Sequence, residues 1–157
     1  NTQWLVTEKQ IETIRNFFLT SRANILEINK RLNGRSLKIA VVVGMRAEKS
    51  RISPASLDNP YGEDSIRNKV FQLEELTQGT NIEWELILTT HNSPDKSDEI
   101  AQEIMESDDL KPFRDKVIIK TITQPGLTIG KGGKVVYVIR YAINATDERP
   151  VPADVVI

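Results

Sequence analysis

Short β-type apolar runs alternate along this chain with longer segments of helical periodicity, and this alternation constrains the fold more than any other feature. The β-type runs cover residues 37–43, 84–90, 116–123 and 153–157. A helical segment precedes the first run and another separates each pair of neighbours, so the expected order is α-β-α-β-α-β-α-β. A strand, a helix and a further strand in succession join parallel strands. We therefore predict an α/β fold with a mostly parallel, Rossmann-like sheet flanked by helices.

The first 36 residues predict one long amphipathic helix. Thr7, followed three residues later by Gln10, is typical of a capping box, and Asn33-Gly34 supplies a stop. Between them, apolar residues recur on a heptad-like seam: Ile11, Ile14, Phe18, Ile25, Ile28 and Leu32. Such a helix packs on the flank of the sheet domain or on a further region, or it pairs with a second subunit as a coiled coil; polar Ser21 on the seam and a length of only roughly three and a half heptads favour the first two. We divide the chain into this helix, 1–36, and an α/β domain, 37–157.

The composition limits the partners. The chain has 21 lysines and arginines against 22 aspartates and glutamates, a net charge of −1 that gives no electrostatic case for nucleic acid. No apolar run approaches the roughly 20 residues of a membrane span. The absence of cysteine excludes disulfides, thiol catalysis and cysteine metal sites, and it favours a reducing compartment. We expect a soluble, cytoplasmic protein whose acidic pairs at 74–75, 98–99 and 108–109 are solvated.

Candidate ligand-binding residues follow the first two strands, because ligands of parallel α/β sheets bind at the carboxyl ends of the strands. Gly44, Arg46 and Glu48 come directly after the first strand, and His91, the only histidine, ends the second. A guanidinium at this edge stacks on a base or pairs with phosphate, and a carboxylate accepts hydrogen bonds from ribose or base. The alternative for Arg46 and Glu48 is a surface ion pair. We expect His91 to be structural or to line the ligand, since one histidine makes no metal site.

A glycine-rich segment, Gly130-Lys131-Gly132-Gly133, opens the last helical segment. It is no Walker A loop, because Val135 follows Lys134 where Ser or Thr is required, and a dinucleotide fingerprint belongs after the first strand. Glycines nevertheless permit close backbone approach, a helix N-terminus presents free N–H groups, and Lys131 adds positive charge. These properties suit a nucleotide or its phosphates. The other interpretation is a glycine turn with a solvated lysine.

The order of these pieces resembles the N-terminal part of a family 2, GT-A-type glycosyltransferase. In that family a Pro-x-Tyr-Asn-Glu-like loop follows the first strand, Asp-Asp-Gly-Ser-x-Asp follows the second, an Asn-x-Gly-Lys-Gly-type loop opens the next helix, and the fourth strand leads to Asp-x-Asp. Residues 44–48 match the first loop and keep only Glu48, and residues 93–101 match the tail of the second motif. Residues 130–133 with 139–143 match the third, and residues 153–157 match the fourth strand.

This resemblance covers residues 37–157 and implies a glycosyltransferase whose nucleotide-diphosphate sugar contacts Gly44, Arg46, Glu48, His91 and Lys131. The acceptor is unidentified. The family's Mg²⁺ or Mn²⁺ ligands and its catalytic residues are expected beyond Ile157, so no metal site is expected within this chain and the chain alone should be inactive. Two departures are evident: Thr90 and His91 replace the paired aspartates that face the base, and Arg46 replaces the loop aromatic.

Two other functions compete with this one. A nucleotidyltransferase has a similar sheet, but it requires a glycine-rich, arginine-containing loop after the first strand, and Gly44-Met45-Arg46 has too little glycine. A non-catalytic α/β nucleotide-binding or interaction module would use the N-terminal helix as its partner surface. The last apolar run, 153–157, predicts a buried central strand in any of these proteins.

Overall fold

A computed structural model describes residues 7–90, 93–121, 131–145 and 151–157. Within these ranges the sheet has four strands: β1 (Leu37–Met45), β2 (Ile82–Thr90), β3 (Val117–Thr121) and β4 (Val155–Val156). Every pairing is parallel, and the strand order is β3-β2-β1-β4. The prediction of a parallel α/β sheet flanked by helices is confirmed.

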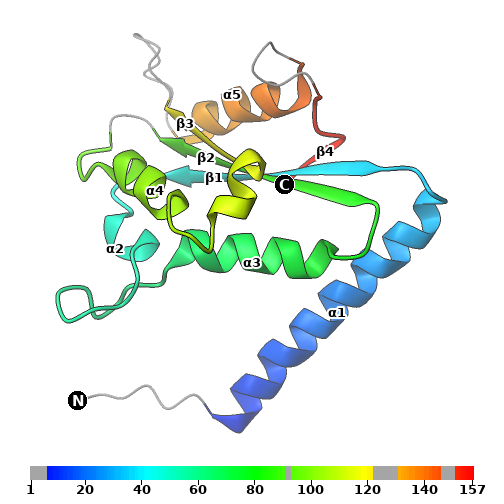
Figure 1. Ribbon diagram of the computed structural model, residues 1–157, viewed down its shortest axis with the longest axis horizontal. Coiled ribbons are helices and arrows are strands. Elements are labelled where there is room, and N and C mark those ends of the chain that lie inside the picture. Colours follow the sequence, from blue (N-terminus) through cyan, green and yellow to red (C-terminus); the bar gives the residue numbers. More distant parts are fainter. Residues whose placement is uncertain (1–6, 91–92, 122–130, 146–150) are drawn as a thin grey trace.

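Helices cover both faces of this sheet (Figure 1). On one face lie α3 (Ser65–Thr77), α4 (Ser97–Met105) and the short 3₁₀ helix η1 (Lys111–Lys116), and on the other lies α5 (Lys131–Ile143). The long connection from β1 to α3 contains the four-residue helix α2 (Lys49–Ile52) and a β-bridge between Pro54 and Glu63. The bridge closes the connection on itself, and Ile52 of α2 belongs to the same core cluster as Met45 at the carboxyl end of β1.

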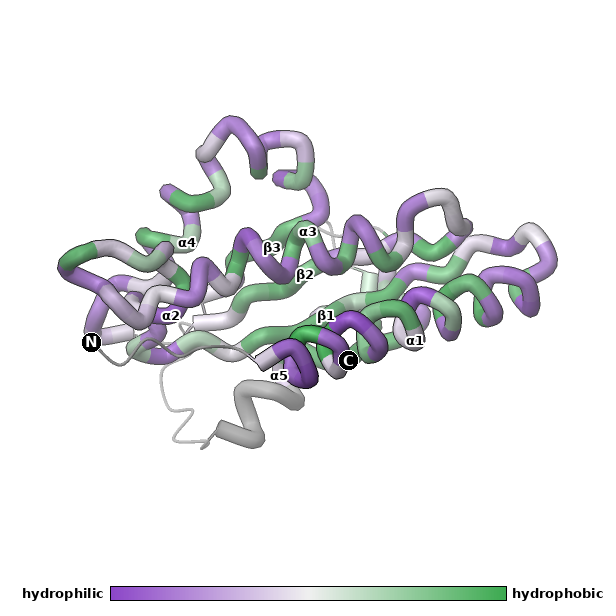
Figure 2. Tube along the Cα trace, turned by 90° about the horizontal axis from the view of Figure 1, so that it is seen from below, coloured by the Kyte–Doolittle hydropathy of each residue, from purple (hydrophilic) through white to green (hydrophobic). Residues whose placement is uncertain are grey.

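Successive side chains of β2 point to opposite faces of the sheet and therefore pack into two different cores. Trp84, Leu86 and Leu88 pack toward α3 and α4, and Ile87 packs toward α5 together with Val138, Ala142 and other small residues. Residues 84–90 are all buried, as expected of a central strand with helices on both faces. Figure 2 shows the consequence: β1 and β2 are largely hydrophobic, while the helices around them carry polar residues outward.

The strand order makes the chain reverse direction across the sheet at β1. From β1 the chain steps to β2 and β3 on one side, and β4 then returns to the other side of β1. The β4 segment is held by bonds on either side of its two strand residues, where Asp154 N donates to Lys38 O and Ile157 N donates to Ala40 O. In the described sheet it is an edge strand, with Val155 41% exposed, whereas a buried central strand was predicted.

The N-terminal helix α1 (Glu8–Leu32) has the predicted ends. Thr7 and Gln10 form a reciprocal capping box, and Asn33 ends the helix in the left-handed conformation. The helix leaves the start of β1 and passes beside α3 (Figure 1), where the Arg22 guanidinium donates to the carbonyl oxygens of Leu76 and Gln78. None of its residues is buried. No described helix is long and apolar enough to cross a membrane.

Candidate functional site

The backbone that follows β1 is held by a polar turn at the start of α4. Three successive N–H groups of the β1 loop are donors: Ala47 N to Ser93 Oγ at 3.0 Å, Glu48 N to Ser97 Oγ at 3.1 Å, and Lys49 N to Asp95 Oδ2 at 2.8 Å. Ala47 itself adopts a left-handed conformation with φ 55°. Because every acceptor comes from residues 93–97, this turn fixes the loop that carries the predicted site.

Asp95 is the centre of this turn. Its Oδ1 accepts from the Ser93 hydroxyl at 2.7 Å, from the Ser97 backbone N–H at 3.2 Å and from the Ser97 hydroxyl. Burial alone would raise the pKa of Asp95, but hydrogen bonds from Ser97, Lys49 and Ser93 outweigh it and lower the pKa to about 2. The carboxylate is therefore ionised at neutral pH and acts as the anchor between the carboxyl ends of β1 and β2.

The predicted residues of the β1 loop lie at this fixed edge. Gly44 is exposed, and a Cβ added to it would meet nothing within 4 Å. Arg46 is exposed just beyond the strand. The Glu48 carboxylate is paired with Arg51 rather than Arg46, with 3.2 Å between Oε2 and Nη1, and Arg51 also contacts Glu63 at 3.1 Å.

The other two predicted residues belong to segments that the structure describes incompletely. His91 lies outside the described residues. Lys131 is the first residue of α5, and its side chain also lies outside them. Because α5 follows β3, which runs parallel to β1 and β2, the backbone of its first turn is connected to the same carboxyl edge of the sheet.

A cavity of about 180 Å³ opens beside the loop, between β1 and α3. Gly44, Glu48 and Arg51 belong to its wall, and the described residues that complete it are Val43, Met45, Ile52, Ser65, Ile66, Lys69, Leu86 and Leu88. Its floor is apolar, and its charged groups are Glu48 of the loop, Arg51 of α2 and Lys69 of α3. It has the size of a small ring or side chain, so it accommodates only part of a larger ligand.

Two buried threonines at the end of β2 occupy different environments. The Thr90 hydroxyl donates to Thr121 Oγ1 at 3.4 Å on the α4 side. Thr89 pairs in register with Gly44 and with Lys120, on the α5 side, and is 4% exposed. In the part of the chain that the structure describes, Thr89 Oγ1 has no hydrogen-bond partner.

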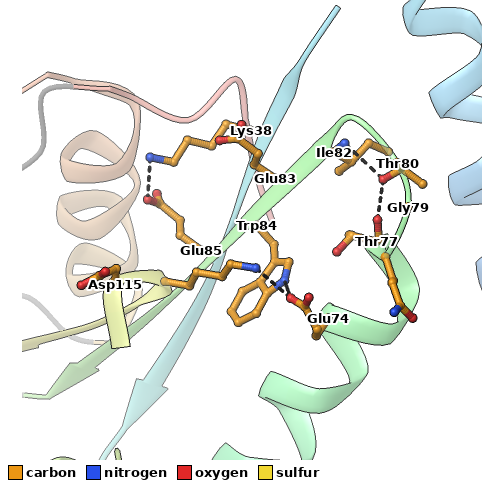
Figure 3. Close-up of a pocket in the computed structure, with 12 residues that line it drawn as sticks. Lys38, Glu74, Thr77, Gly79, Thr80, Ile82, Glu83, Trp84, Glu85 and Asp115 are labelled. Atoms are coloured by element: carbon orange, nitrogen blue, oxygen red, sulfur yellow. Dashed lines mark hydrogen bonds and ion pairs between the residues drawn. The ribbon is translucent and has the colours of Figure 1, made fainter. Parts of the chain in front are cut away.

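A larger cavity, of about 410 Å³, lies at the opposite end of the strands (Figure 3). Lys38 and Glu85 point toward one another and pair at 3.1 Å, and Glu74 accepts from Trp84 Nε1 at 3.0 Å and from Lys116 at 2.8 Å. The hydrogen bond from Lys116 lowers the pKa of Glu74. The expectation that Glu74 is simply solvated is therefore wrong, since it joins α3 to β2 and η1.

Sequence reasoning missed the two features that distinguish the carboxyl edge. The spacing Ser93-x-Asp95-x-Ser97 at a helix start is typical of side chains that hydrogen-bond local backbone, and it could have revealed the turn. Its partners, 46 to 49 residues away in the sequence, could not be read from spacing. The unpartnered hydroxyl of Thr89 had no signal, because a threonine in a strand is ordinary.

Comparisons with protein-family models, with curated proteins and with solved structures found no match. Across the described ranges, no three histidine, cysteine, aspartate or glutamate side chains come together in a way that could hold a metal ion.

Proposed function

We propose that this chain is the donor-binding portion of a GT-A-type glycosyltransferase that uses a nucleotide-diphosphate sugar. The observation that carries the proposal is the reversal of strand order at β1, in the sequence β3-β2-β1-β4. That order agrees with the first four strands of a doubly wound nucleotide-binding sheet, whose ligand lies outside the carboxyl ends of the strands where the order reverses. Gly44 is the second-last residue of β1, and Arg46 and Glu48 follow the strand at that position.

Each proposed contact has a chemical role. Gly44 leaves the strand backbone accessible to the ligand, and Arg46 stacks on the base or pairs with phosphate. Glu48 accepts from ribose hydroxyls or base N–H groups, and His91 lines the nucleoside. Lys131, with the N–H groups of the first turn of α5, binds the phosphate side. The turn around Asp95 keeps the β1 loop in place before the ligand arrives, which reduces the entropy lost on binding.

Transfer of the sugar to its unidentified acceptor would require a cation, Mg²⁺ or Mn²⁺, to stabilise the leaving diphosphate. No group of described side chains fits such an ion. We therefore assign neither a metal ligand nor a catalytic base in this chain, and the proposal for its residues is limited to binding the donor. A cytoplasmic location, where nucleotide sugars are made and consumed, is part of the same proposal.

The test is calorimetric titration of the 157-residue chain with UDP, GDP, CDP and ADP. We expect one of them to bind, and Glu48→Gln and Lys131→Ala each to weaken it by about 1–3 kcal/mol, roughly 5- to 150-fold in Kd. Glu63→Gln is the matched control, because Glu63 contacts the same Arg51 as Glu48 but is no proposed contact. Absence of binding to all four diphosphates, or equal affinities in the wild type and both site variants, would contradict the proposal.

A second function, a non-catalytic interaction module, is favoured by α1. Ile11, Ile14 and Phe17 are 56%, 66% and 75% exposed on a helix that buries none of its residues. Exposed apolar side chains in this number are typical of a protein-binding surface. Sedimentation of the wild type and of Ile14→Glu tests it: association that the substitution abolishes supports a coiled-coil pairing of α1, and a wild-type monomer at all concentrations opposes it.

A further inference from the structure

The hydroxyl of Thr89 is the starting point. The residue is 4% exposed, and its Oγ1 has no partner within the described ranges. Nearly all buried polar groups in proteins are hydrogen-bonded, because leaving one unpaired costs stability. Valine has almost the same shape as threonine and would avoid that cost in a strand. Among the described residues, the hydroxyl at this position therefore has a hydrogen bond left to make, which a ligand can complete.

The space that such a partner would occupy lies on the neighbouring strand. Gly44 pairs in register with Thr89, so both present the same face of the sheet, the face covered farther along by α5. A Cβ built on Gly44 would meet no atom of the described residues within 4 Å. Neighbouring strands are about 4.8 Å apart, which puts an atom above Gly44 within hydrogen-bonding reach of the Thr89 hydroxyl after rotation of its side chain.

The charges around this position indicate which part of a ligand fits. Lys120 is the register partner of Thr89 on β3, but its ammonium group lies over the Tyr141 ring, 4.8 Å from the ring centre, and is thus already engaged by an aromatic ring of α5. Gly44 and Thr89 themselves bear no charge. A hydroxyl both donates and accepts, which suits the neutral polar edge of a base or ribose better than a diphosphate.

We infer that Thr89 is a ligand-contacting residue whose hydroxyl binds the uncharged nucleoside part of the donor, with that nucleoside lying against the bare backbone of Gly44. This inference rests on the proposed function and deepens it, because it separates a neutral nucleoside subsite on β1 and β2 from the phosphate subsite at α5. The cost of the unpaired hydroxyl in the free protein is recovered when the ligand binds.

The experiment measures stability and affinity in the same variants. Thr89→Val removes the hydroxyl and keeps the shape; Gly44→Ala fills the open space above β1 without a contact to protein atoms. Thr77→Val is the control: Thr77 is also buried, at the opposite end of the sheet, and its hydroxyl donates to Leu73 O at 2.8 Å. Each variant is titrated with the diphosphate that the wild type binds and with the corresponding nucleoside, and each is unfolded in urea.

We expect Thr89→Val to be at least as stable as the wild type and to bind nucleoside and diphosphate about three- to ten-fold more weakly, by the same factor for both. Gly44→Ala should also weaken both, and Thr77→Val should lose stability but keep its affinity. Unchanged affinity in Thr89→Val, or weaker binding of the diphosphate alone, would overturn the inference. The proposed function would still stand in that case, provided that the wild type binds the nucleotide. A wild type that binds neither compound would overturn both.

Discussion

The two ends of the β1–β2 pair use polar groups in opposite ways. At the amino end the side chains satisfy one another: Lys38 pairs with Glu85, and Glu74 accepts from both Trp84 and Lys116. At the carboxyl end it is the loop backbone that is satisfied, by the turn around Asp95, while a Cβ added to Gly44 would meet none of the described atoms within 4 Å. A side-chain network that completes itself stabilises a fold, whereas a loop whose backbone is already held, with Gly44 and Arg46 exposed beside it, suits a binding site.

The largest effect should come from removing the ring at the paired end. Trp84 is 3% exposed, packs at 6.2 Å from the Phe113 ring and donates to Glu74. Trp84→Ala should lower the free energy of unfolding by about 3–5 kcal/mol, through lost burial, a cavity and the loss of one of the two hydrogen bonds to Glu74. Urea unfolding followed by circular dichroism measures it, with Tyr61→Ala, at an 81% exposed position, as the control. A loss below about 1 kcal/mol would contradict the conclusion that the polar network at the amino end stabilises the fold.

The next effect tests the rigidity of the carboxyl end. Because the pKa of Asp95 is lowered from 3.8 to about 2 in the folded protein, its contribution is present above pH 3.8 and is lost as the pH falls toward 2. Asp95→Asn should therefore cost on the order of 2 kcal/mol at pH 7 and progressively less below pH 3.8. Unfolding curves from pH 7 to pH 2 measure the difference.

Asp108→Asn is the matched control for that pH series, since the side chain of Asp108 is 96% exposed and contacts only Lys111 among described residues. It should follow the wild type at every pH. If Asp95→Asn followed the wild type as well, the turn would not hold the loop. The conclusion that the backbone at the carboxyl end is held rigid would then be wrong.

Periodicity predicted the elements of this fold because each element is decided locally. The capping pair Thr7 and Gln10, the stop at Asn33 and the central strand through Trp84 were all visible as short-range patterns. The edge position of β4 was not, because apolar composition does not distinguish a central strand from an edge strand with one covered face.

The candidate site was predictable only in its position. The rule that ligands meet the carboxyl ends of parallel strands directed attention to Gly44 and Glu48. It could not show that Glu48 pairs with Arg51, because that contact depends on the side-chain rotamers. Nor could it show that Asp95 anchors the loop, because Asp95 and Lys49 are far apart in the sequence. The role of Glu74 was misjudged for the same reason, since its partners Trp84 and Lys116 come from other elements.

The smallest effect compares one carboxylate from each end. Glu74 receives two hydrogen bonds, and the one from Lys116 lowers its pKa, so its contribution is present above the ordinary glutamate pKa and is lost as the pH falls through the lowered one. Glu48 has a single ion pair, with Arg51 58% exposed. Glu74→Gln should therefore cost about 1 kcal/mol at pH 7, and Glu48→Gln no more than about 0.5 kcal/mol. Urea unfolding of both variants at equal ionic strength, repeated at pH 3, measures the two costs. If Glu48→Gln proved as costly as Glu74→Gln, the carboxylate nearest the proposed ligand would be a structural group. The carboxylates at both ends of the sheet would then stabilise the fold to the same degree.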